Sequence, residues 1–159
     1  MNIFILDYDP AAAAQYHCDK HVIKMILESA QMLCTACNLD GQSTPYKTTH
    51  KNHPCNVWVR ESLSNWLWLR QLAFWLNEEY RIRYHKNVNH KSWNVINSLS
   101  NPNIPDKGLT DFAKAMPEQY RNDGSAVNCY RSYYLGEKSN IAKWSNRSAP
   151  FWWREQCPA

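Results

Sequence analysis

Polar side chains, most of which can exchange protons, recur at helical spacing near the start of the chain. At about 100° per residue, seven of them fall within one arc of roughly 100°: His17, Lys20, His21, Lys24, Glu28, Gln31 and Thr35. Imidazole, ammonium and carboxylate groups this close together shift one another's pKa values, so such a set can move protons near neutral pH. Because coupled titrating groups gather at active sites, the candidate catalytic residues are Glu28, Lys24, His21 and His17. The alternative is a strip of solvated side chains on a buried helix.

The stretch that carries these residues is predicted to be one long helix. Asp9 suits the N-cap and Pro10 the first helical position, and no further Gly or Pro occurs before Gly41. Outside the polar arc, this helix is apolar over most of its circumference. A helix of this kind belongs in the centre of a domain. We therefore expect a helix over residues 10–37 whose polar arc opens onto water, a partner or a site.

Length and composition predict one globular domain over residues 1–159 with an all-α fold. The chain is long enough to bury its own core, and 44% of its residues are hydrophobic. Further helical patterns lie at residues 54–59, 64–86, 87–100 and 125–134, and the helix at 64–86 is expected to pack against the first one. Residues 2–6 form either a short buried strand or an extended segment, and proline makes residues 101–117 irregular.

Aromatic content and charge favour nucleic acid as the partner. The chain has eight Trp and nine Tyr, a net charge of +4 and a pI near 8.7. Aromatic rings stack on bases, and Lys and Arg neutralise phosphates. We expect DNA, with RNA or a nucleotide as further options. The candidate contacts are Lys20, Gln31, Lys47, His50, Lys51, His53, Lys143, Arg147 and Arg154.

Two segments outside the helices carry many of these contacts. Residues 41–55 are polar, basic and rich in Pro and Gly, which indicates a loop that contacts phosphates or a merely solvated connection. Residues 137–159 interleave basic and aromatic side chains. They suit a clamp on nucleic acid or a tail packed on the core, and we favour packing for Phe151 and Trp152.

The six cysteines do not indicate a disulfide framework. The first residues lack the basic and long apolar parts of a signal peptide, so we expect a reducing cytoplasm, that of a host cell if the protein is phage-encoded. No run of residues approaches membrane-spanning length, and no membrane partner is expected. Nothing in the sequence indicates an oligomeric state.

The metal-binding patterns in the sequence are incomplete. Cys34 and Cys37 form a single CxxC, and a four-thiolate zinc site would need a second pair. We favour no metal and expect no cofactor. Zinc or another divalent ion, if bound, would draw on His17, His21, His50, His53 and Cys55.

Three segments carry a resemblance to known proteins. MNIFILDYDP, CDKHVIKMILESAQML and YKTTHKNHPCNVWVRES resemble a family of small proteins encoded by tailed phages. The helical plan, the early helix with His, basic residues and Glu, and the aromatic C-terminus are similar to the phage pyrimidine-dimer DNA glycosylases of the endonuclease V type. That second resemblance implies base excision followed by strand cleavage through a Schiff base.

Particular residues take roles under the glycosylase resemblance. It implies that Glu28 stabilises the sugar as it becomes oxocarbenium-like. It also implies that His17, Lys20 and Lys24 contact phosphate beside a flipped nucleotide.

The nucleophile is where this sequence departs from the glycosylases. That family uses the amino group of a small second residue, whereas Asn2 is bulky and Met1 is expected to be retained. The nucleophile would then be the Met1 amine or Lys24.

Three function classes follow from these observations. The first is a DNA repair glycosylase with possible AP-lyase activity. The second is a non-catalytic phage protein that binds nucleic acid or a host protein. The third is a metal-dependent nuclease or hydrolase.

Overall fold

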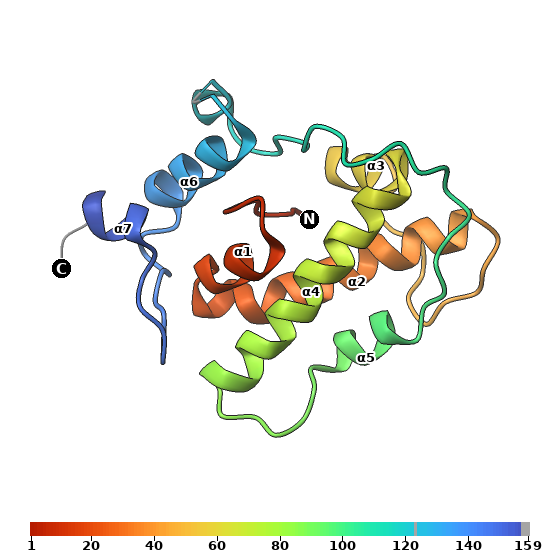
Figure 1. Ribbon diagram of the computed structural model, residues 1–159, viewed down its shortest axis with the longest axis horizontal. Coiled ribbons are helices and arrows are strands. Elements are labelled where there is room, and N and C mark those ends of the chain that lie inside the picture. The colour runs from red at the N-terminus through yellow and green to blue at the C-terminus, as the bar shows by residue number, and fades with distance from the viewer. Residues whose placement is uncertain (123, 157–159) are drawn as a thin grey trace.

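The protein, described here by a computed structural model over residues 1–122 and 124–156, is all-α, which confirms the predicted fold class. These residues contain seven α-helices and one 3-10 helix, with no strand (Figure 1). In chain order they are α1 (Pro10–Tyr16), α2 (Asp19–Leu39), α3 (Pro54–Glu61), α4 (Leu63–Arg83), α5 (Lys91–Asn97), η1 (Glu118–Tyr120), α6 (Ala126–Glu137) and α7 (Phe151–Gln156).

Two helices of 21 residues, α2 and α4, form the centre of the fold. They pack on each other, and α3 and α5 pack on both of them, while α1 packs on α4. Trp66 of α4 is fully buried, and its Nε1 donates to the carbonyl oxygen of Leu33 in α2 at 3.3 Å. The predicted packing between the first helix and the helix at residues 64–86 is therefore confirmed.

The start of the chain runs through the interior as an extended segment. Ile3, Phe4, Ile5 and Leu6 are all buried, and Figure 1 shows the N-terminus near the centre of the view, between α6 and α3. The ring of Phe4 stacks on that of His21 in α2, with centroids 4.6 Å apart. Of the two predicted conformations the extended one is found, because no described strand pairs with this segment.

The prediction of one helix over residues 10–37 is wrong, because the helix is interrupted between α1 and α2. The ψ angles of His17 and Cys18 are 135° and 161°, which is extended backbone. Side chains from elsewhere satisfy the carbonyl groups that the interruption frees. Arg83 of α4 donates to the carbonyl oxygen of His17, and Trp144 donates to that of the preceding residue at 3.0 Å. These donors make an interruption possible without Gly or Pro.

The second half of the chain follows the predicted outline with two additions. The helix α5 lies within residues 87–100, residues 101–117 contain no helix, and Ser125 caps α6. The 3-10 helix η1 and the short helix α7 were not predicted. Within it Trp152 is buried, as expected, whereas Phe151 is 47% exposed.

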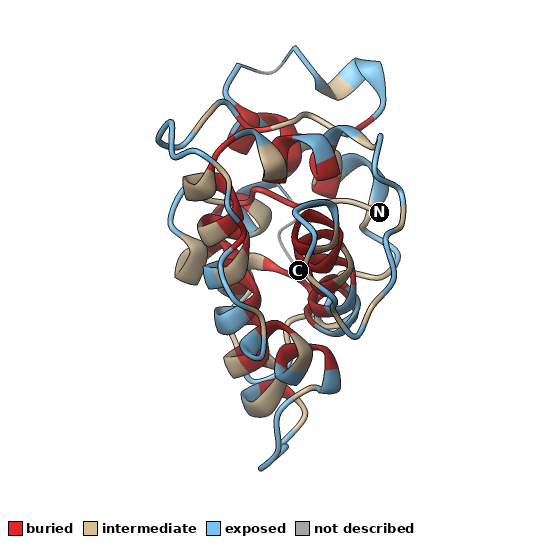
Figure 2. Ribbon diagram, turned by 90° about the vertical axis from the view of Figure 1, so that its right-hand side faces the viewer, coloured by how far each residue is buried: buried red, intermediate tan, exposed pale blue. Residues whose placement is uncertain are grey.

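Buried residues line the inward faces of the helices, and the connecting segments are mostly exposed (Figure 2). The buried hydrophobic side chains form one cluster that includes the N-terminal segment. The five cysteines at positions 18, 34, 37, 55 and 129 are buried and free. Cys157 lies outside the described residues.

Candidate functional site

The first residue of the chain lies against a carboxylate of α2. The amino group of Met1 is 3.0 Å from Oε1 of Glu28, and the backbone N–H of Asn2 donates to the same oxygen at 2.9 Å. The other oxygen, Oε2, is buried without a hydrogen bond from any described residue and lies 3.9 Å from Nζ of Lys24. Glu28 thus holds an amine with one oxygen, while the other lies near the Lys24 ammonium group without a hydrogen bond from the described residues, which is an unusual state for a buried carboxylate.

Asn2 fixes the position of this amine. Its side-chain N–H group donates to the carbonyl oxygen of Ala115 at 2.9 Å. Its side-chain oxygen accepts from Oη of Tyr130 at 3.3 Å and from Sγ of Cys55 at 3.4 Å. These partners belong to the irregular segment before α6, to α6 itself and to α3. The end of the chain is therefore anchored by three separate parts of the fold, which aims the Met1 amine at Glu28.

Two primary amines lie near Glu28, and they differ in exposure. The side chain of Met1 is only 3% exposed, whereas the residue as a whole is half-buried. Its accessible part therefore lies in its backbone, to which the amino group belongs. The side chain of Lys24 is 67% exposed, and its Nζ lies 3.9 Å from Oε2 of Glu28. The amino group of Met1 lies nearer, 3.0 Å from Oε1 of Glu28, so Met1 is the better placed of the two to exchange a proton with the carboxylate.

The loop at residues 41–55 joins this site. His53 is half-buried, and its Nδ1 accepts a backbone N–H at the start of α3 at 3.1 Å. Burial lowers the pKa of His53, and the charges of the Met1 amine and of His50 lower it further, while Glu28 acts in the opposite direction. An imidazole, an amine and a carboxylate from three parts of the chain therefore share one electrostatic environment.

The surface of α2 differs from the predicted polar arc. We use the name open face of α2 for its accessible residues beside the site, which are Lys20, Ile23, Lys24, Leu27 and the half-buried Gln31. The residues on the other flank of the arc are buried: His17, His21, Glu28 and Thr35. The N-terminal segment covers this flank, because Phe4 stacks on His21 and the first residue meets Glu28. The expectation that the whole arc opens outward is wrong.

A hollow of about 350 Å³ lies beside the open face. Its lining residues are Leu27, Gln31, Pro45, Tyr46, Lys47 and Thr49. The backbone N–H of Thr49 donates to Oγ1 of Thr35 at 3.1 Å, which holds the loop against α2. The volume is near the lower end of small-ligand pockets. Apolar surface, an amide and an ammonium group together suit a planar polar ligand such as a nucleobase.

His17 and His21 lie in the interior. Nδ1 of His17 is 2.7 Å from the carbonyl oxygen of Ala13, and Nδ1 of His21 is 2.6 Å from Oη of Tyr134. Burial lowers the pKa of His17 to about 4 and that of His21 to about 3. Both imidazoles are therefore neutral at pH 7 and shielded from the surface, and we give them no part in the proposed chemistry.

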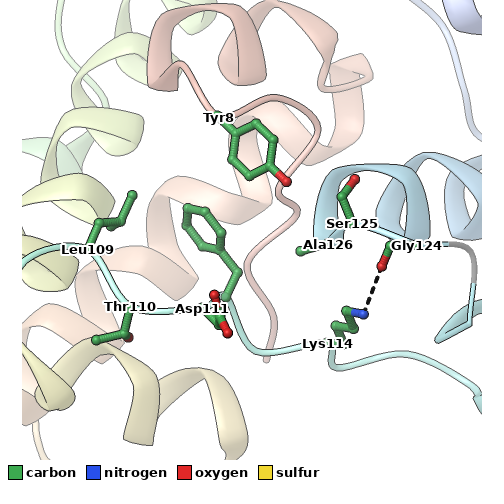
Figure 3. A pocket seen from close by; sticks show the side chains of 9 residues that line it. Tyr8, Leu109, Thr110, Asp111, Lys114, Gly124, Ser125 and Ala126 are labelled. Atoms are coloured by element: carbon green, nitrogen blue, oxygen red, sulfur yellow. Dashed lines mark hydrogen bonds between the residues drawn. The ribbon is translucent and has the colours of Figure 1, made fainter.

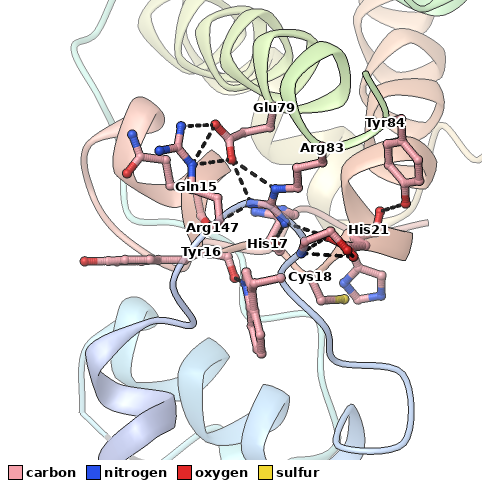
Figure 4. A network of polar contacts seen from close by, with 12 residues as sticks. Gln15, Tyr16, His17, Cys18, His21, Glu79, Arg83, Tyr84 and Arg147 are labelled. Carbon is pink, nitrogen blue, oxygen red and sulfur yellow. Dashed lines mark hydrogen bonds and ion pairs between the residues drawn. The ribbon is translucent and has the colours of Figure 1, made fainter. Parts of the chain in front are cut away.

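A buried ion network, which the sequence analysis missed, lies beside the interruption between α1 and α2 (Figure 4). Oε1 of Glu79 accepts from Nη2 of Arg83 at 2.8 Å, and Oε2 accepts from Nη2 of Arg147 at 2.6 Å. Burial alone would raise the pKa of Glu79, but the hydrogen bonds from both arginines outweigh it and lower the pKa. Arg83 also lies 3.3 Å from Asp19 at the start of α2. The network fixes the C-terminal segment against α4.

The three predicted C-terminal contacts are in different environments. Arg147 is occupied by Glu79, whereas Lys143 and Arg154 are exposed. The carbonyl oxygen of Lys143 accepts the backbone N–H of Asp19 at 2.8 Å. This contact places Lys143 beside the start of α2, next to the open face.

A second hollow, of about 400 Å³, is bounded by Tyr8, residues 109–112 and the start of α6 (Figure 3). Nζ of Lys114 donates to the carbonyl oxygen of Gly124 at 3.0 Å, and Asp111 adds a carboxylate to the lining. With its lysine engaged and an acid present, this hollow is poorly suited to phosphate, and it contains neither Glu28 nor Met1.

Residues 1–122 and 124–156 contain no group of three or more His, Cys, Asp or Glu that could hold a metal ion. Burial raises the pKa of the Cys55 thiol to about 11, which disfavours the thiolate that metals bind. In the same part of the chain, no helix is both long and apolar enough to cross a membrane.

Comparison of the chain with protein-family models, with curated proteins and with solved structures gave no match.

The sequence analysis missed three features of this site: the anchoring role of Asn2, the exposure of Ile23 and Leu27, and the network around Glu79. None of them has a local signal, because each depends on partners elsewhere in the chain. No pattern in the sequence indicates that Met1 contacts Glu28, which lies 27 residues further along the chain.

Proposed function

We propose that the protein is a DNA glycosylase with AP-lyase activity in which the Met1 amino group is the nucleophile and Glu28 its acid–base partner. The observation that carries the proposal is the 3.0 Å contact between this amine and Oε1 of Glu28. The resemblance to phage pyrimidine-dimer glycosylases implies the same two kinds of group, an amine at the start of the chain and a glutamate on an early helix.

The proposed reaction takes place at C1′ of a damaged nucleotide. The lone pair of the neutral amine forms a bond to C1′ while the N-glycosidic bond breaks, and the base leaves with that electron pair and a proton. Opening of the sugar ring converts the adduct into an imine. Loss of a C2′ proton to a base then expels the 3′-phosphate by β-elimination, and water hydrolyses the imine to free the amine.

Glu28 suits this reaction because its two oxygens differ. Oε1 can take the proton that the attacking amine loses, since it already contacts that amine. Oε2 has no hydrogen bond from the described residues and can face positive charge as it develops on the sugar. Glu28 is only 7% exposed, and a carboxylate acts more strongly on a neighbouring charge where water is excluded.

Cations around the pair suit a DNA substrate. Lys20 and Lys24 stand on the open face of α2, and Lys47 lines the hollow beside it. Contacts of this kind neutralise phosphates and set the register of a duplex without reading its sequence.

Borohydride trapping tests the proposal. The protein is incubated with sodium borohydride and duplex DNA that carries an abasic site or a pyrimidine dimer, so that an imine is reduced to a stable secondary amine. Peptide mapping by mass spectrometry should locate the adduct at Met1. Glu28→Gln should slow trapping by about 10²–10⁴-fold and leave equilibrium binding of the same DNA nearly unchanged. Glu155→Gln, an exposed carboxylate of α7, is the matched control and should behave like the wild type.

Two other results of the trapping experiment would change the proposed nucleophile or the proposed function. An adduct at Lys24 would keep the reaction class and move the nucleophile to α2. Salt-dependent DNA binding without any adduct would contradict the lyase and favour a non-catalytic nucleic-acid-binding protein, the function that the cationic open face supports by itself.

A further inference from the structure

Two aliphatic side chains stand on the open face of α2, although the other apolar residues of this helix are buried up to its last turn. Ile23 is 37% exposed and Leu27 is 41% exposed. They are four residues apart and therefore lie on the same side of the helix, one turn from each other. Their exposure forms a short apolar ridge on a helix that is otherwise mostly covered.

The surroundings of this ridge point to a polyanion with apolar parts. Lys20 precedes Ile23 by three residues, Lys24 follows it directly, and both lysines are exposed. Glu28 follows Leu27 directly and points about 100° further around the helix, and Lys24, one turn before Glu28, pairs with it at 3.9 Å. Double-stranded DNA has this combination of charged phosphates and flat apolar base faces, whereas a soluble acidic peptide offers no base step between which an aliphatic side chain could insert.

Glu28 and the amino group of Met1, the reactive groups of the proposed function, are recessed. A nucleotide must therefore leave the base stack to reach them, and an apolar ridge can assist this step. Glu28 is 7% exposed, and the accessible part of Met1 lies in its backbone. The C1′ atom of a nucleotide stacked within a duplex cannot enter a recess of this kind. Enzymes that act on a buried nucleotide extrude it from the stack, which costs a few kcal/mol of unstacking.

Leu27 also lines the hollow of about 350 Å³ with Gln31, Tyr46 and Lys47. The ridge therefore adjoins a space that a displaced nucleotide could enter, on the same helix as Glu28. Val57 and Ile82, apolar residues of similar exposure on other helices, do not line this hollow.

We propose that Ile23 and Leu27 form a wedge that enters duplex DNA beside the damaged nucleotide and separates the stacked bases. The inference rests on the function proposed above and adds that the substrate is double-stranded DNA that the protein opens. The wedge residues position the substrate and take no part in the covalent step.

The test compares one abasic strand in two forms, alone and paired with its complement. Borohydride trapping is measured for the wild type, for the double variant Ile23→Ala, Leu27→Ala, and for the control Val57→Ala, Ile82→Ala. The wedge variant should trap the duplex about tenfold more slowly or worse, because unstacking is then unaided. It should trap the single strand within about twofold of the wild-type rate, since a single strand offers its C1′ without unstacking.

A second readout does not depend on catalysis. In the Glu28→Gln background, binding of a duplex with 2-aminopurine beside the abasic site should raise the fluorescence of this base as it unstacks. The wedge variant should lose that rise, and the control should keep it. Unfolding midpoints of all variants establish that they are folded.

The outcomes separate the two proposals. Equal loss on duplex and single strand, or no loss on duplex, overturns the wedge while the lyase stands. Absence of any adduct with wild-type protein overturns the lyase, and the 2-aminopurine signal then decides the wedge by itself.

Discussion

At the scale of single residues, burial and position divide the roles of the polar side chains of the first 35 residues. His21 and Glu28 occur on the same flank of α2 and are both buried. His21 meets the ring of Phe4 and the hydroxyl of Tyr134, whereas Glu28 meets the charged end of the chain. The imidazole is consequently a neutral core residue, and the carboxylate is a candidate for chemistry.

The buried histidines predict acid sensitivity. The folded-state pKa values of His17, about 4, and His21, about 3, lie below the ordinary value of 6.5. The unfolded chain therefore binds more protons as the pH falls below 6.5, so stability is full above that pH and is lost as the pH falls towards the folded-state values. Between about pH 6.5 and 5 the free energy of unfolding should fall by about 1.5 kcal/mol per histidine.

Urea denaturation across this pH range measures the effect. The variant His17→Gln, His21→Gln should be less stable than the wild type at neutral pH, because a core contact is lost, but its stability should depend less on pH. Parallel pH profiles for the two proteins would contradict this origin of the acid sensitivity.

At the scale of elements, the interruption between α1 and α2 depends on side chains from α4 and from the C-terminal segment. Arg83 is 3% exposed, donates to the backbone at the interruption, and pairs with Glu79. Arg147 pairs with the other oxygen of the same glutamate. Three segments distant in sequence are thus joined by one buried carboxylate and two guanidinium groups.

This arrangement predicts a large effect of Arg83→Met. Loss of the guanidinium leaves Glu79 with one partner and leaves carbonyl groups at the interruption without a donor, which should cost about 3–5 kcal/mol of unfolding free energy. Arg81→Met is the matched control on the same helix. Its pair with Glu78 is long, 3.7 Å, and partly exposed, so the loss should stay below about 1 kcal/mol. Urea denaturation compares the variants, and equal losses would mean that the buried network contributes no more than the exposed pair.

At the scale of the whole molecule, the path of the first residues determines the site. The extended segment passes through the core to place the amino group of Met1 on Glu28, and Thr49 of the loop at residues 41–55 donates to Thr35, about two turns further along α2. Lys20, Lys24 and Lys47 are left exposed around the site. The molecule thereby combines a recessed amine–carboxylate pair, Met1 and Glu28, with a rim of exposed lysines.

The cationic rim predicts salt-dependent DNA binding. If Lys20, Lys24 and Lys47 each neutralise one phosphate, the logarithm of the affinity should fall with the logarithm of salt concentration with a slope of about −2.7. Each lysine-to-alanine change should reduce this slope by about 1 and act equally on all sequences. Fluorescence anisotropy at several salt concentrations measures it. Lys86→Ala, exposed beyond the end of α4, should keep the slope, and an unchanged slope in all three site variants would exclude this rim as the contact surface.

The sequence by itself determined the all-α class, the pairing of the two long central helices and a helix that begins near Ser125. Helical periodicity and capping depend on residues that are close in sequence. The packing of two broad apolar helix faces against each other can be predicted without knowing the individual contacts. Glu28 and Lys24 could also be named as candidates from their residue types, and the Met1 amine from the resemblance to the glycosylases.

Only the tertiary structure decided which of these groups meet. The helix is interrupted at His17 because Arg83, 66 residues away, supplies a donor. Glu28 is paired with Met1 because Asn2 is held by Ala115, 113 residues further along the chain. The polar arc is half covered, and Ile23 and Leu27 are exposed, because the N-terminal segment lies on one flank of α2 and leaves the other open. Contacts over such separations leave no periodic trace in the sequence, since they depend on how whole segments pack and not on the spacing of neighbouring residues.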